Sequence, residues 1–95
     1  MNASRIDRLR EQITAALQPT TLEIEDESHR HAGHAGAKTG MGHFRVKVVS
    51  GLFEGLRPLQ RHRLVYDAVA ELMKTDVHAL SIDARTPEEN GPALP

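Results

Sequence analysis

The sequence predicts a single α+β domain in which helices cover a three-stranded mixed sheet. The stretches 5–18 and 58–74 repeat apolar residues with the 3.6-residue period of a helix, and three shorter stretches alternate apolar and polar residues as strands do. The length of 95 residues and the hydrophobic fraction of 39% are ordinary for one globular domain. We therefore expect one domain over 1–95, with an ordered core at about 4–86 and a frayed tail over 87–95.

The first predicted helix covers residues 5–18. Ser4 is a suitable cap residue, and Asp7 follows it at the spacing of a helix start signal. Pro19 ends the helix, because a proline disfavours helical backbone in the residue before it. The next stretch, 21–27, alternates apolar and acidic residues, which predicts a half-buried strand.

Residues 28–42 follow neither period and predict a long loop that is mobile in the free protein. They contain four glycines and three histidines, and a loop of this length in a small domain is usually functional or disordered. A second strand is predicted for 43–50, a second helix for 58–74 and a third strand for 77–84. In the third strand, His78 has the same phase as the core-facing residues.

The order of these elements predicts where the histidines meet. Two strands joined by a loop should pair antiparallel, whereas the helix between the second and third strands predicts a right-handed crossover and parallel pairing. The second and third strands then begin at the end of the sheet from which the long loop emerges. We expect five of the six histidines to gather there, namely His29, His31, His34, His43 and His78.

Imidazole is both a proton carrier near neutral pH and a common metal ligand, but each histidine also has a structural interpretation. His62 lies among apolar residues of the second helix and is expected to be buried and hydrogen-bonded. His43 is more readily explained as an anchor for the loop than as a ligand. For His78 the two interpretations are balanced, and the loop spacing His-x-His-x-x-His is by itself only a weak metal signal.

The composition argues against several classes of protein. The absence of cysteine excludes disulfides, thiolate nucleophiles and a metal site made of the chain's own thiolates, and it agrees with a cytoplasmic location. No apolar run is long enough for a membrane span, and neither a secretory signal nor a transit peptide is apparent. There is no phosphate-binding glycine motif and no activated serine, so we expect no enzymatic activity.

Seven short stretches, taken together and in this order, resemble the BolA family. The resemblance runs from about Ser4 to Glu88, with two departures: Gly42 stands where threonine is common, and no tryptophan follows residues 86–88. The stretches are 26–28 (Asp-Glu-Ser), 31–34 (His-Ala-Gly-His), 42–46 (Gly-His-Phe-Arg-Val), 48–50 (Val-Val-Ser), 53–55 (Phe-Glu-Gly), 61–66 (Arg-His-Arg-Leu-Val-Tyr) and 77–82 (Val-His-Ala-Leu-Ser-Ile).

The resemblance implies a fold similar to a class II KH domain and partnership with a monothiol glutaredoxin. In such complexes the two proteins share a [2Fe–2S] cluster: the glutaredoxin and glutathione each give a cysteine, and the BolA chain gives two ligands. The family's ligand in its His-Ala-Leu segment corresponds to His78, and its loop ligand corresponds best to His31, with His34 as the alternative. The isolated chain is then expected to hold no cofactor and to be either a monomer or a weak homodimer.

The family's other implied activity is transcriptional regulation through DNA binding. Folds similar to KH domains often bind nucleic acid, and four basic residues are candidates for phosphate contacts. However, the chain has a net charge of −1 and few aromatic residues for stacking, so we favour the iron–sulfur adaptor. A zinc or nickel site at the three loop histidines is the third interpretation. The candidate basic residues are Lys47, Arg57, Arg61 and Arg63.

Overall fold

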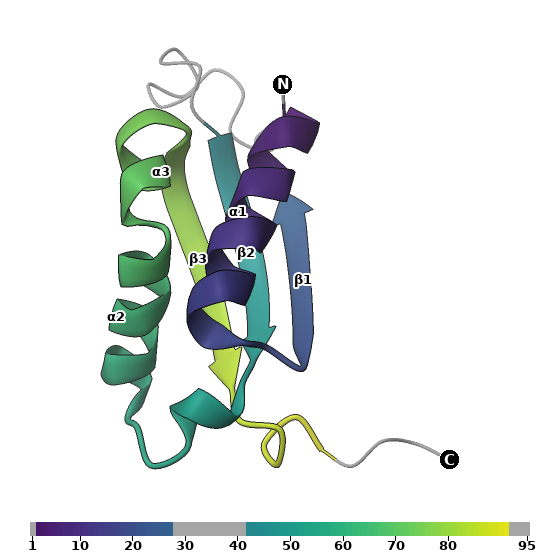
Figure 1. The fold of residues 1–95 in the computed structure, drawn as a ribbon, viewed down its shortest axis with the longest axis vertical. Helices are drawn as coiled ribbons and strands as arrows, with labels where there is room; N and C mark the ends of the chain where they lie inside the picture. Colours follow the sequence, from purple (N-terminus) through teal and green to yellow (C-terminus); the bar gives the residue numbers. More distant parts are fainter. Residues whose placement is uncertain (1, 28–41, 92–95) are drawn as a thin grey trace.

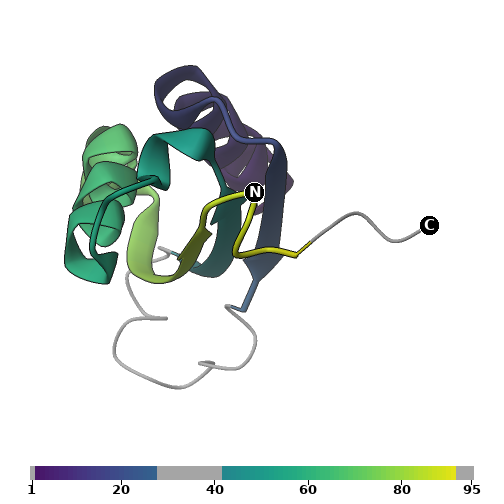
Figure 2. The same ribbon diagram turned by 90° about the horizontal axis from the view of Figure 1, so that it is seen from below.

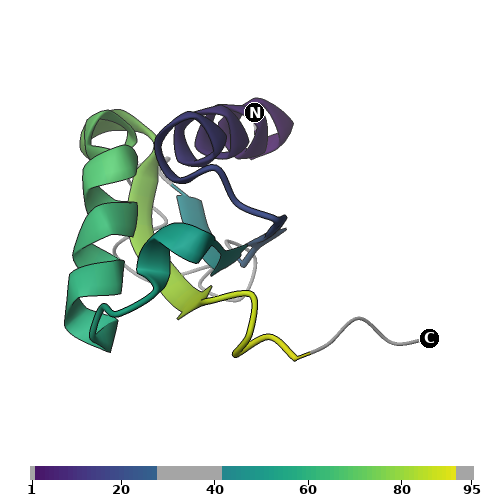
Figure 3. The ribbon, with the colours of Figure 1, turned by 60° about the horizontal axis from the view of Figure 1, so that its bottom comes forward.

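The structure is a computed structural model that describes residues 2–27 and 42–91. Its strands form one three-stranded sheet in the order β1-β2-β3, and its helices lie on one face of that sheet (Figure 1). Views from the lower end of the sheet show the same two layers (Figures 2 and 3). The elements are α1 (Asn2–Leu17), β1 (Thr21–Asp26), β2 (Gly42–Val49), the 3-10 helix η3 (Gly51–Phe53), α2 (Pro58–Ala68), α3 (Ala70–Thr75) and β3 (Val77–Arg85).

The predicted fold class and strand pairing are confirmed. β1 pairs antiparallel with β2, from Thr21 opposite Val49 to Asp26 opposite Phe44. β2 pairs parallel with β3, because the chain crosses over through α2 and α3 between these two strands. The starts of β2 and β3 therefore lie at the same end of the sheet.

The hydrophobic core lies between the sheet and the helices. β2 supplies its centre, where Phe44, Val46 and Val48 are at most 1% exposed. With only three aromatic residues in the chain, aliphatic side chains fill most of the remaining space. The buried core residues from the other elements are Leu9, Ile13, Leu17, Phe53, Val65, Val69, Leu72, Val77 and Leu80.

Helix α1 begins three residues earlier than predicted and ends one residue before the predicted end. Its first residue is Asn2, so Ser4 lies inside the first turn and not at the cap. At the other end, Gln18 takes a left-handed conformation with φ of 48° and donates its N–H to the carbonyl of Thr14 at 3.1 Å. Pro19 follows and cannot continue the helix.

A buried serine joins the end of α1 to the end of β2. The Ser50 side chain is fully buried, and its hydroxyl donates to the carbonyl of Leu17 at 2.7 Å. The same oxygen accepts the N–H of Leu52 at 3.1 Å and thereby caps η3. One hydroxyl thus satisfies two backbone groups that helix ends otherwise leave without partners.

The predicted helix over 58–74 is divided in the structure. Val69 leaves the helical conformation, with φ of −112° and ψ of 18°, and separates α2 from α3. Its N–H is shared between the carbonyls of Val65 and Tyr66, each at 3.2 Å, which tightens the turn at that point. The sequence pattern did not reveal this break, because apolar residues continue at helical spacing across it.

The segment after β3 begins with a turn that hydrogen bonds connect to α2. Thr86 and Glu89 bond each other reciprocally: the hydroxyl of Thr86 accepts the N–H of Glu89 at 3.1 Å, and the Glu89 carboxylate accepts the N–H of Thr86 at 3.0 Å. The guanidinium of Arg61 on α2 binds the same carboxylate at 3.0 Å. The start of the tail is therefore held against α2 up to this turn.

The first prediction concerns the buried hydroxyl of Ser50. Replacing Ser50 with Ala leaves a buried carbonyl and a backbone N–H without their partner, which should lower the free energy of unfolding by about 1–3 kcal/mol. Urea unfolding measures this quantity directly. The exposed Ser81 on β3 offers a control, since Ser81→Ala should change stability by less than about 0.5 kcal/mol. Equal effects of the two substitutions would contradict the assigned role.

The second prediction concerns stability in acid. Hydrogen bonds from Arg61 and from the backbone of Thr86 lower the pKa of Glu89 from 4.5 to about 2. A carboxyl group with a lowered folded-state pKa stabilises the fold above its unfolded pKa, and this stabilisation is lost as the pH falls from about 4.5 towards 2. Glu89→Gln should therefore flatten the decline in stability over that pH range, as measured by urea unfolding at several pH values. Glu88→Gln is the control, and an unchanged acid profile in Glu89→Gln would refute the assignment.

Candidate functional site

The segment 28–41 leaves and re-enters the described structure at the end of the sheet where β2 and β3 begin. On one side of it, the N–H of Glu27 donates to the carbonyl of His43 at 2.8 Å. On the other side, the N–H of Gly42 donates to the carbonyl of Asp76 at 2.9 Å. The loop and its three histidines are outside the described residues, so the predicted mobility of the loop stays a prediction. Both points at which the loop is attached lie at the predicted end of the sheet.

Two histidines meet at this end of the sheet. The rings of His43 and His78 lie side by side, with centroids 5.1 Å apart and planes tilted by 45°. His43 is half-buried and its Nε2 atom lies in the interior, whereas His78 is exposed. The predicted meeting of His43 with His78 is therefore confirmed, and His78 is the one of the pair that solvent reaches readily.

A β-bulge at the start of β3 determines where His78 lies. Gly42 is opposite Val77 and His43 is opposite Ala79, so His78 is an extra residue with no partner on β2. Val77 and the next buried residue, Leu80, are three positions apart, which breaks the two-residue alternation of a regular strand. The prediction that His78 shares the core-facing phase is wrong for this reason.

An ion-pair cluster fixes the start of β3 against α1. The carboxylate of Asp76 contacts the guanidinium of Arg8 and lies 3.8 Å from Nε of Arg5. A hydrogen bond from the hydroxyl of Thr75, followed by the contact with Arg8, holds the pKa of Asp76 below its usual value. This cluster was not predicted from the sequence, where its only signal is the spacing of the two arginines, which places them on one face of α1.

The described residues do not form a complete metal site. Within 2–27 and 42–91, no group of three or more His, Cys, Asp or Glu side chains is placed to hold a metal ion. Asp76, the acidic residue two positions before His78, is already bound to arginine. His78 is thus an accessible imidazole that offers one ligand, and a metal bound there needs further ligands from the segment 28–41 or from another molecule.

The arginines considered for DNA binding differ in their surroundings. Arg61 is held in place: its side chain is 11% exposed, and it donates to the carbonyl of Leu56 at 2.9 Å as well as to Glu89. Arg57, the residue that precedes α2, and Arg63 on α2 are exposed. Two of the three arginines are therefore accessible to a phosphate, while Arg61 has a structural role.

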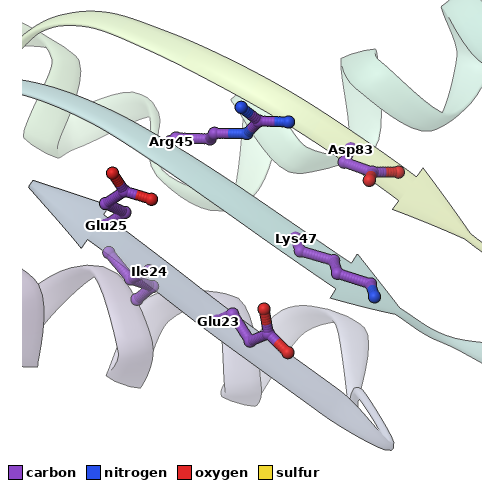
Figure 4. Close-up of a pocket in the computed structure, with 6 residues that line it drawn as sticks. All are labelled: Glu23, Ile24, Glu25, Arg45, Lys47 and Asp83. Carbon is purple, nitrogen blue, oxygen red and sulfur yellow. The ribbon is translucent and has the colours of Figure 1, made fainter. Parts of the chain in front are cut away.

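Lys47 lies on the opposite face of the sheet from these arginines, in a hollow of about 380 Å³ (Figure 4). Arg45 and Lys47 on β2 are flanked by Glu23 and Glu25 on β1 and by Asp83 on β3. This face carries charges of both signs, unlike the uniformly basic surface that phosphate binding favours. The four basic candidates do not form one continuous surface.

Within the described parts of the chain, no helix is long and apolar enough to cross a membrane. One relative described below is named as chloroplastic. The cytoplasmic location expected from the sequence therefore stays a prediction.

Comparison with known proteins identifies the family. The model of the family described as "BolA-like protein" matches residues 13–89. The chloroplastic protein BOLA1 of Arabidopsis thaliana is 48% identical over 90 residues, which are 92% of this chain and 56% of that protein. The Escherichia coli protein named DNA-binding transcriptional regulator BolA is 45% identical over 83 residues, which are 87% of this chain and 76% of that protein.

A solved structure gives the same result. The BolA domain of SufE1 from Arabidopsis thaliana matches with a TM-score of 0.80 and 44% identity over 90% of this chain and 95% of that domain. The chain spans little more than half the length of several of the curated relatives that it matches. The family model covers the chain from the end of α1 to the turn after β3, including the whole sheet with His43 and His78, and the chain therefore belongs to the BolA family.

Proposed function

We propose that this chain is a BolA-like adaptor that binds a monothiol glutaredoxin and contributes histidine ligands to a [2Fe–2S] cluster shared by the two proteins. Its role would be in iron–sulfur and iron homeostasis, without catalysis. The observation that carries the proposal is the exposed imidazole of His78, which a bulge displaces from the core-facing phase at the sheet end where the segment 28–41 is attached.

The ligands available in this chain fit a shared cluster better than a complete site of its own. The sequence contains six histidines and no cysteine, so the thiolates of a cluster must come from the partner. Neutral imidazole is a competent iron ligand, and His78 is accessible to a partner. When bound, the cluster would supply iron for electron transfer or for delivery to a client. The second ligand would be His31, or His34 in its place, both outside the described residues.

The surroundings of His78 favour a ligand that is already positioned before the partner arrives. The ring of His43 lies against the imidazole of His78 on one side. The ion pairs of Asp76 and the hydrogen bond from Gly42 to its carbonyl hold the first residues of β3 in place. A rigid support of this kind lowers the entropy lost when a metal ligand is ordered on binding.

The third prediction tests His78 directly. His78→Ala should alter the visible absorption and circular dichroism spectra of the complex with a cluster-loaded monothiol glutaredoxin, and it should weaken the heterodimer about tenfold or more, because an iron ligand is lost. The free energy of unfolding of the isolated chain should change by less than about 0.5 kcal/mol, since the side chain is exposed.

A matched set of variants gives this experiment its controls. His62→Ala removes a half-buried imidazole on α2, and it should leave the cluster spectrum unchanged. His31→Ala, His34→Ala and the double variant identify the second ligand. An unchanged spectrum and affinity in His78→Ala would contradict the proposal, and a large loss of stability in the isolated chain would show a structural role instead.

DNA binding is the second candidate function, because one relative is named as a DNA-binding transcriptional regulator. Among the four basic candidates, Arg57, which precedes α2, and Arg63 on α2 are exposed and accessible to phosphate. The chain has a net charge of −1, so the duplex repels it overall. Binding to DNA would therefore depend on the local positive charge of Arg57 and Arg63.

The fourth prediction tests this candidate. Arg57→Glu with Arg63→Glu should abolish binding to a labelled duplex in fluorescence anisotropy, and binding by the unmodified chain should weaken steeply between about 50 and 200 mM salt. Lys74→Glu on α3 is the control and should retain most of the affinity, because Lys74 is paired with Glu71 at 3.1 Å. Binding that is insensitive to salt, or that survives the double substitution, would exclude this surface.

A further inference from the structure

The two edges of the sheet are protected to different extents. At β3, two side chains of α2 bind backbone carbonyls: the hydroxyl of Tyr66 donates to Leu80 at 3.2 Å, and Arg61 donates to Ala84 at 3.4 Å. At β1, the corresponding bond runs from Arg10 of α1 to the carbonyl of Leu22 at 3.3 Å. α2 and α3 lie beside β3, whereas no described element lies beyond β1 (Figures 1 and 2).

The pairing of β1 with β2 shows which backbone groups face outward. Glu27 donates its N–H to His43, the residue opposite it in the continued register, so odd-numbered residues of β1 direct their backbone groups towards β2. The even-numbered residues Leu22, Ile24 and Asp26 therefore direct theirs towards the outer edge. The bond from Arg10 to the carbonyl of Leu22 agrees with this assignment. No described helix or strand covers this edge, and such an edge is able to pair with another strand.

The charges of β1 indicate what kind of strand matches this edge. Glu23 and Glu25 are exposed on the face of the sheet that the helices leave uncovered. On β2, their direct cross-strand partners are Lys47 and Arg45. Opposite charges at paired positions stabilise an antiparallel sheet. The sequence of β2 therefore shows which kind of strand pairs well with β1: one with a basic residue opposite each acidic residue of β1 and apolar residues between them.

We propose that the outer edge of β1 binds an extended basic segment of a partner protein as a fourth strand of the sheet. Its alternating basic side chains lie beside Glu23 and Glu25, its apolar side chains lie on the side of Leu22 and Ile24, and its backbone pairs with the outward groups of β1. A second copy of this chain is a poorer occupant, because antiparallel pairing of two β1 strands centred on Ile24 places acidic residues opposite acidic residues.

The experiment uses the full chain and a capped hexapeptide, Lys-Val-Arg-Val-Lys-Val. Addition of the peptide to the ¹⁵N-labelled protein should give saturable shifts and slower hydrogen exchange at the amides of Leu22 and Ile24. The amides of Leu80 and Ile82 on β3 should remain unchanged. A peptide methylated at alternate backbone nitrogens cannot donate those hydrogen bonds and should lose the binding.

A charge exchange tests the complementarity. Glu23→Lys with Glu25→Lys should weaken binding of the basic peptide about tenfold, because two attractive cross-strand pairs become repulsive. The same variant should gain affinity for Glu-Val-Glu-Val-Glu-Val. Glu54→Lys with Glu71→Lys changes the net charge equally at two exposed positions outside α1 and the sheet, and it should leave binding nearly unchanged.

Three results would overturn the proposal. Equal binding of the methylated peptide would show that no strand is added. An equal loss of affinity in the control variant would show non-specific attraction. Protection of the Ile24 amide without peptide, together with a dimer in light scattering, would show that a second copy of the chain occupies the edge instead.

Discussion

The parallel pairing of β2 with β3 is the constraint on which the rest of the structure depends. A parallel pair needs a crossover between its strands, and α2 and α3 provide it while covering the sheet. The same pairing places the starts of both strands at one end, where the segment 28–41 is also attached. His43 and His78 are 35 positions apart in the sequence, and the parallel pairing brings their ring centroids to 5.1 Å from each other. The geometry of the candidate site is thus a consequence of the topology.

The topology could be predicted from the sequence because it follows from periodicity and element order alone. The exposure of His78 could not, because the position of a bulge depends on how two strands fit together and not on the pattern of one of them. Regular alternation along β3 would put His78 on the same face as Leu80. Gly42 and His43 are instead opposite Val77 and Ala79, so His78 is an extra residue between these two partners and is exposed. The break at Val69 was hidden for a related reason, since apolar spacing continues across it.

Arg61 shows the same limit for charged residues. A run of arginines at the start of a helix is compatible with either phosphate binding or structural hydrogen bonding, and composition does not separate these roles. In the fold, Arg61 joins three segments by binding the carbonyls of Leu56 and Ala84 and the carboxylate of Glu89. Its neighbours Arg57 and Arg63 point to solvent. The difference arises from contacts with residues up to 28 positions away, which only the folded chain brings together.

The proposed division of ligands has a physical consequence for cluster exchange. His78 lies on a strand whose first residues are held by ion pairs and backbone hydrogen bonds, so its position changes little when a partner binds. The other proposed ligand would come from the segment 28–41, and the thiolates would come from the partner. A cluster whose ligands all come from one protein is released only when all the bonds to that protein break. A cluster whose ligands come from two proteins is lost or transferred when the two proteins separate. Under this proposal the chain supplies only part of the ligand set, which suits an adaptor for a shared cluster, because a complete set would retain the cluster after the partner leaves.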